Sequence, residues 1–141
     1  MFDQVARQEL NDAIAAAEKG HRGEVRVHVE RTSPQGTTAS DRADQLFESF
    51  GMHRTREDTA VLLYVSFDEG RSAVHAGSGI GGATTPEFWK SVTAEIDRGF
   101  SIGEPLAGLC AALEQIGDVL RKHAAGEDIA GNELPDLVTS S

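Results

Sequence analysis

Residues 61–76 read VLLYVSFDEGRSAVHA, and the predicted architecture depends most on this segment. Its first half, Val61–Val65, is a nearly continuous apolar run, which is typical of a central strand covered on both faces. Asp68, Glu69 and Gly70 are turn residues, and Arg71–Ala76 has the pattern of a second, weaker strand. Two adjacent strands joined by so short a turn predict a β-hairpin.

The chain before this hairpin predicts a strand between two helices. Apolar residues recur at helical spacing from Phe2 to Ala17, and residues 24–31 then alternate polar and apolar with valine at every second position. That alternation predicts a strand with one face buried, with His28 as a satisfied surface histidine. A second amphipathic helix, ending at Gly51, follows. A helical crossover favours parallel, right-handed pairing of residues 24–31 with Val61–Val65.

Two further helices are predicted after the hairpin. Thr85-Pro86-Glu87 opens the first with a hydroxyl cap, a proline and an acid, and Pro105 starts the last, which ends near residues 124–126. The prediction is an α/β fold: a small mixed sheet, made of a parallel pair plus the hairpin, with helices on both faces. Residues 1–126 form its single domain and residues 127–141 a polar C-terminal tail. The side chains expected in the core are Val61, Leu63, Val65, Trp89, Val92, Ile96, Leu109 and Leu113.

The composition excludes some classes of partner. The formal net charge of −10 opposes binding to nucleic acid and to anionic lipid, whereas a basic protein partner or a cation is compatible with it. A solubility role for this charge stays open. The single cysteine, Cys110, stands among leucines at helical spacing and is interpreted as a packed side chain rather than a nucleophile. The sequence shows neither a secretory signal pattern nor a run of about 20 apolar residues, so a cytoplasmic location is expected.

Several segments together resemble the TPM domain family, in its short, stand-alone bacterial form. They are Gly23–Val29, the hexapeptide Gly51–Arg56, Val61–Val65, Glu87–Trp89 and the tail motif Asn132–Asp136, and they occur in the order seen in that family. The resemblance covers nearly the whole chain, and Gly51–Arg56 is its most specific element. It implies a helix-covered mixed sheet, in agreement with the pattern of the residues.

The resemblance also implies two activities found among family members: acid phosphatase activity and binding of a divalent cation, calcium or magnesium. Asp58 matches an acidic position that precedes the second strand in longer members. The acids that follow the glycine-rich segment in those members have no counterpart here, because no carboxylate occurs from Gly77 to Pro86. Asp58 is therefore the one candidate metal ligand, and we expect weak calcium binding at most.

A candidate anion site comes from two other segments. Gly77, Gly79 and Gly82 formally match a dinucleotide fingerprint, but the helix after them is followed by another helix rather than by a strand. Gly79, with the Thr84 and Thr85 hydroxyls at a helix start, could still contribute to an anion site, or the segment could be a plain turn and cap.

The second segment is a basic island: His53, Arg54 and Arg56 could hold a phosphate or carboxylate, or could serve the end of the preceding helix. If the hairpin forms, this island, Asp58 and the glycine segment share one edge of the sheet. The sequence thus predicts a cleft at that edge.

Two functions remain open from the sequence. The first is a non-catalytic binding or accessory module that acts on a protein partner or a small anion. The alternative is a metal-assisted acid phosphatase that hydrolyses phosphomonoesters, with Asp58 as ligand and His53, Arg54 and Arg56 holding the phosphate. Convergence of two or more carboxylates on one point would distinguish them.

Overall fold

The computed structural model describes residues 1–54, 57–124 and 138–140. The element order is α1 (Gln4–Ala17), β1 (Val25–Glu30), α2 (Ala39–Ser49), the short 3-10 helix η1 (Met52–Arg54), β2 (Val61–Ser66), β3 (Arg71–Ala76), α3 (Ser78–Gly81), α4 (Pro86–Ser101), α5 (Pro105–His123) and β4 (Val138–Ser140). Arg56 and nearly all of the predicted tail lie outside the described residues.

The four strands form one mixed sheet in the order β3-β2-β1-β4. β1 and β2 are parallel, with Val27 opposite Leu63, and β2 and β3 form the predicted antiparallel hairpin, with Leu63 opposite Val74. The predicted fold class is therefore confirmed. β4 was not predicted, and it pairs in parallel with β1 at Val27–Val29.

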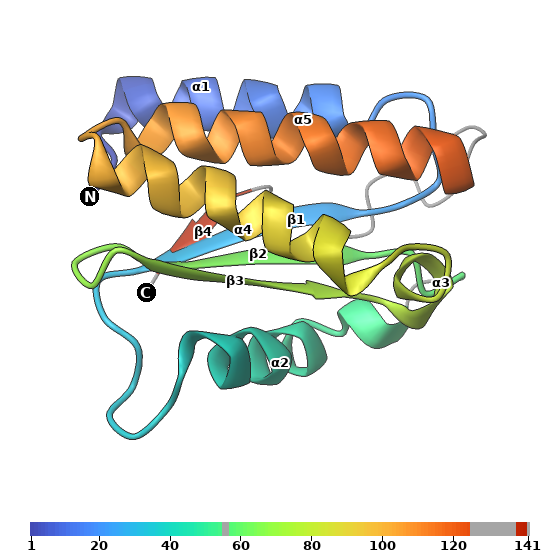
Figure 1. Ribbon diagram of the computed structural model, residues 1–141, viewed down its shortest axis with the longest axis horizontal. Coiled ribbons are helices and arrows are strands. Elements are labelled where there is room, and N and C mark those ends of the chain that lie inside the picture. Colours follow the sequence, from blue (N-terminus) through green and yellow to red (C-terminus); the bar gives the residue numbers. More distant parts are fainter. Residues whose placement is uncertain (55–56, 125–137, 141) are drawn as a thin grey trace.

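Helices cover both faces of the sheet in unequal layers. α1, α4 and α5 lie on one side and α2 on the other (Figure 1). The larger core, on the three-helix side, contains Val61, Leu63 and Val65, and the smaller core, under α2, contains Leu62 and Tyr64. Seven of the eight predicted core side chains are buried, and Trp89 is the exception because it is only partly buried. Within the described residues, no helix is long and apolar enough to cross a membrane.

The prediction for β1 was wrong on one point: all six of its residues are buried, including Arg26, His28 and Glu30. Strict alternation is typical of a strand with one wet face, but β1 lies inside the sheet, and its polar side chains lie on the α2 face. Burial of such groups requires partners. Arg42 of α2 donates two hydrogen bonds to Glu30, at 2.9 and 2.7 Å, and the Tyr64 hydroxyl donates a third, at 2.8 Å.

This polar network changes the ionisation of its members. The hydrogen bonds from Arg42 lower the pKa of Glu30 to about 2, and burial lowers the pKa of His28 below 6.5. Burial also raises the pKa of Tyr64 to about 12. His28 is therefore a buried neutral imidazole at neutral pH rather than a surface histidine, and Glu30 is an anion held by Arg42.

Candidate functional site

The turn before β2 is built around Asp58, whose φ of 54° is in the left-handed region. This conformation is uncommon for a non-glycine residue, although aspartate tolerates it better than most. Here the Asp58 carbonyl accepts a hydrogen bond from the Gly79 amide at 2.8 Å. Its carboxylate accepts two more at Oδ2, from the Ser78 amide at 3.0 Å and the Ser78 hydroxyl at 2.5 Å. The glycine segment after β3 thus wraps around the residue that leads into β2.

Two glycines make this close approach possible. A Cβ added at Gly79 would lie 2.0 Å from the Glu57 carbonyl oxygen, and one added at Gly77 would lie 2.2 Å from the Asp58 carbonyl oxygen. Both distances are far below van der Waals contact, and the obstructing atoms are backbone. Gly77 and Gly79 therefore serve the packing of two backbone segments, which is one standard reason for a glycine in a turn.

A cleft of about 590 Å³ opens beside this turn, between α2 and the end of β3. We call it the Asp58 cleft, and its chemically distinctive lining residues are Asp44, Phe47, Glu48, His53, Asp58 and His75. Asp44 and Glu48 come from α2, and His75 from β3. The sequence predicted a cleft at this edge of the sheet with Asp58 and His53 beside it, and both residues line the cleft observed here.

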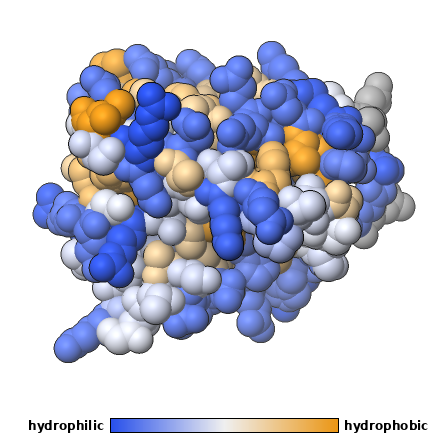
Figure 2. All heavy atoms as spheres, in the orientation of Figure 1, coloured by the Kyte–Doolittle hydropathy of each residue, from blue (hydrophilic) through white to orange (hydrophobic). Residues whose placement is uncertain are grey.

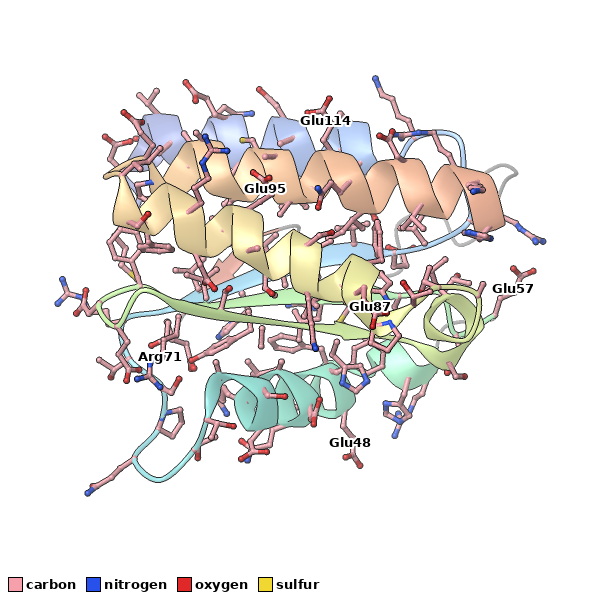
Figure 3. All side chains as sticks on the ribbon, in the orientation of Figure 1. Glu48, Glu57, Arg71, Glu87, Glu95 and Glu114 are labelled. Atoms are coloured by element: carbon pink, nitrogen blue, oxygen red, sulfur yellow. The ribbon has the colours of Figure 1, made fainter. Side chains whose placement is uncertain are left out.

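The charge of the Asp58 cleft is predominantly negative. Asp44 and Glu48 are exposed carboxylates, and Figure 3 shows Glu48 at the outer side of α2, directed away from the sheet. Nδ1 of His75 lies 2.6 Å from Oδ1 of Asp44, and the His75 ring packs on Phe47 with ring centroids 4.1 Å apart. These contacts fix His75 against α2, with Phe47 as an apolar floor.

The predicted anion-site residues that the structure describes do not form one site, and Arg56 lies outside that part of the chain. His53 lines the Asp58 cleft, and Arg54 is an exposed residue at the end of η1. The Gly79 amide is already donated to Asp58. Thr84 and Thr85 instead line a different cavity, of about 500 Å³, beside Lys122 and His123 near the end of α5.

The two threonine hydroxyls also have roles within the fold. Oγ1 of Thr84 accepts a hydrogen bond from Nε1 of Trp89 at 2.7 Å and donates to the Ile80 carbonyl at 2.9 Å. Oγ1 of Thr85 accepts from the Phe88 amide at 3.3 Å and caps α4. The cap predicted from Thr85-Pro86-Glu87 is thus confirmed.

The carboxylates of the Asp58 cleft do not converge as a divalent-cation site requires. A calcium ion needs six to eight oxygen ligands at about 2.3–2.6 Å. Among the described residues, no group of three or more histidine, cysteine, aspartate or glutamate side chains is placed to hold a metal ion. Oδ2 of Asp58 accepts from Ser78, and Oδ1 of Asp44 is in contact with His75. The arrangement as it stands does not fit a resident calcium or magnesium ion.

Asp44 and Glu48 were not among the site residues predicted from the sequence. Both lie on the polar face of α2, which reads as an ordinary solvated helix surface. Only the docking of α2 against β2 and β3 brings them to the end of β3. No local signal in the sequence marks them.

The model of a family described as the TPM domain matches residues 1–119. No curated protein matches the chain.

Solved structures give three similar folds. The BA42 protein from the psychrophilic bacterium Bizionia argentinensis is 28% identical, with a TM-score of 0.87 over 100% of this chain and 96% of that one. An N-terminal domain of a P. gingivalis protein is 20% identical, with a TM-score of 0.70 over 89% and 82% of the two chains. The N-terminal domain of the cg2496 protein from Corynebacterium glutamicum is 11% identical, with a TM-score of 0.68 over 90% and 79%. The last two likenesses show the fold alone.

Proposed function

The chain belongs to the TPM domain family, and we propose that it acts as a non-catalytic binding module that engages a basic protein partner through the Asp58 cleft. The sequence left two kinds of ligand open, a protein partner and a small anion. The geometry of the cleft favours the protein partner.

One observation carries this proposal: the donors of the glycine segment, which would be needed to hold an anion there, are already used by Asp58. The Gly79 amide, the Ser78 amide and the Ser78 hydroxyl all donate to it. What the cleft offers to a ligand is the carboxylates of Asp44 and Glu48 beside an apolar floor. A lysine or arginine side chain matches both features, because its stem is apolar and its head is cationic.

The net charge of −10 supports the same direction of recognition, since it attracts basic proteins over long range. The absence of a converged carboxylate group among the described residues supports a non-catalytic role. The metal-assisted phosphatase remains the alternative, and it requires that cleft carboxylates rearrange around a cation.

The test is calorimetric titration with a trilysine peptide at low ionic strength. We expect Asp44→Asn and Glu48→Gln each to weaken binding by roughly two- to fivefold, the range of an exposed ion pair. Glu114→Gln is the matched control, because Glu114 is an exposed glutamate on α5 in the opposite layer (Figure 3). Equal affinity in all the variants would mean that the peptide responds only to overall charge, and would overturn the proposal.

A second measurement addresses catalysis. Hydrolysis of p-nitrophenyl phosphate in calcium or magnesium should not exceed the rate without protein. Turnover that is lost in Asp58→Asn would establish the phosphatase instead.

A further inference from the structure

β3 is an edge strand of the sheet. Among the described residues, its only strand neighbour is β2. The Gly77 amide donates to the Ala60 carbonyl, and the register pairs Leu62 with His75 and Tyr64 with Ala73. In an antiparallel ladder the bonded pairs alternate, so the main-chain groups of Ser72, Val74 and Ala76 point away from β2.

This edge is open to an added strand. β3 lies at the near side of the sheet, with α4 above it and α2 below it (Figure 1). Ser72, Val74 and Ala76 are all half-exposed. The surrounding surface is mostly hydrophilic, with small hydrophobic areas between (Figure 2). Six consecutive residues of β3 pair with β2 without interruption, so the edge is regular along its length.

The usual protection of an edge is weak here. Natural proteins block exposed edges with proline, bulges or charged side chains. β3 contains no proline and no bulge, and Arg71, at its start, is its only lysine, arginine, aspartate or glutamate residue. A regular strand of six residues presents an edge about 20 Å long.

The edge leads directly into the Asp58 cleft. His75 and Ala76, the last residues of β3, line that cleft together with Asp44, Glu48 and Asp58. At the other end of β3, the Ser72 hydroxyl donates to the Asp97 carboxylate of α4 at 3.1 Å. The outer edge of β3 and the cleft that the carboxylates line are therefore adjacent.

We propose that an extended basic segment of a partner protein adds to β3 as a further strand and places its lysine or arginine side chains in the Asp58 cleft. This inference rests on the proposed function and names its partner. Main-chain hydrogen bonds to Ser72, Val74 and Ala76 supply affinity that depends little on sequence, and the carboxylates supply the preference for a basic segment. Successive side chains of a strand alternate between faces, so basic residues at every second position lie on the α2 face.

Charge argues against a second copy of this chain as the occupant. Two copies paired through β3 would bring together two surfaces of a protein with a net charge of −10, each carrying Asp44 and Glu48. Like charges across an interface are unfavourable. A basic segment reverses the sign of this interaction.

The experiment uses an acetylated and amidated hexapeptide of alternating lysine and valine. Its binding should slow solvent exchange at the amides of Ser72, Val74 and Ala76, because these donors gain partners. The amides of Ala73 and His75 already bond to β2 and should change little. Two N-methylated versions, one methylated at each valine and one at each lysine, remove donors from opposite edges of the peptide. One version should bind about tenfold more weakly than the parent or worse, and the other should bind almost as well.

Glu48→Lys should weaken binding of the hexapeptide at least as much as it weakens binding of trilysine. Glu114→Lys makes the same charge change in the opposite layer and should have little effect on the binding of either peptide. Each outcome is informative. If trilysine binds the cleft but the hexapeptide protects none of the three β3 amides, strand addition is wrong and the proposed function stands. If neither peptide binds, both are wrong. If light scattering shows a dimer whose β3 amides are protected without peptide, the occupant is a second copy and the inference is overturned.

Discussion

The contact between the glycine segment and Asp58 gives the sharpest prediction, which is that Gly79→Ala destabilises the protein by about 1.5–4.5 kcal/mol. The new Cβ would stand 2.0 Å from the Glu57 carbonyl oxygen and 2.9 Å from the Asp58 carbonyl oxygen. Forcing backbone apart in a packed region costs about 1–3 kcal/mol. Separation also breaks the 2.8 Å hydrogen bond from the Gly79 amide to Asp58, which adds about 0.5–1.5 kcal/mol.

Gly81→Ala is the matched control for this prediction. Gly81 belongs to the same short helix, α3, and its added Cβ meets only the Ala76 carbonyl oxygen, at an ordinary 3.6 Å. Replacing a glycine by alanine at such a position changes stability little, or raises it by up to about 1 kcal/mol through the unfolded state.

The assay is urea unfolding followed by circular dichroism, with the free energies of the two variants compared with that of the parent. A Gly79→Ala variant that is no less stable than Gly81→Ala would refute the account of how this turn is held.

Three further predictions follow from the core, the buried polar network and the cleft. Leu63→Ala should lower the free energy of unfolding by about 2–5 kcal/mol, because Leu63 is fully buried at the centre of the sheet; an unchanged melting temperature would contradict this. The folded-state pKa of Glu30, about 2, is depressed below the ordinary 4.5, so its contribution of about 3 kcal/mol is present above pH 4.5 and is lost as the pH falls toward 2. The pKa of His28 is also depressed, so further stability is lost as the pH falls below 6.5. Urea unfolding at a series of pH values from 7 to 3 measures the contributions of Glu30 and His28 together. If the free energy of unfolding of Glu30→Gln depended on pH as steeply as that of the parent, the contribution assigned to Glu30 would be wrong. Calcium titration by calorimetry should show weak binding at most, and micromolar affinity would support the phosphatase alternative.

Much of the fold could be predicted from local sequence signals. The apolar run Val61–Val65 and the turn at residues 68–70 predicted the hairpin, and Thr85-Pro86-Glu87 predicted the start of α4. These features depend on the residues within one element and its cap. They are therefore visible without knowledge of the tertiary structure.

The parallel pairing of β1 with β2 was predicted, but the burial of the polar face of β1 could not be predicted in this way. Its alternation indicates two unlike faces, and a polar face is usually wet. Here two residues outside the strand supply the partners that let Glu30 be buried. Arg42 lies 12 residues further along the chain, and Tyr64 lies in another strand. β4 was missed for a related reason, since a three-residue strand gains its stability from the neighbour it pairs with.

The candidate site was predicted in part. The sequence placed Asp58 and the glycine segment at one edge of the sheet, and they are in contact there. It treated the glycine amides as free for an anion, whereas the amide of Gly79 is donated to Asp58. It left out Asp44 and Glu48, because the side of α2 that meets the cleft depends on how α2 packs against β3.

The central claim is that the Asp58 cleft receives a basic group rather than an anion. Its most direct test is to map the amide chemical shifts of the protein with two ligands in parallel, trilysine and inorganic phosphate. Trilysine is expected to shift the amides of Asp44, Glu48 and His75, which line the cleft. Millimolar phosphate is expected to leave Arg54, Gly79 and Thr85 unmoved, because the Gly79 amide is occupied and Thr85 lies in a different cavity. Joint movement of Arg54, Gly79 and Thr85 with phosphate, with no response to trilysine around Asp44, would contradict the proposed function and restore the anion site.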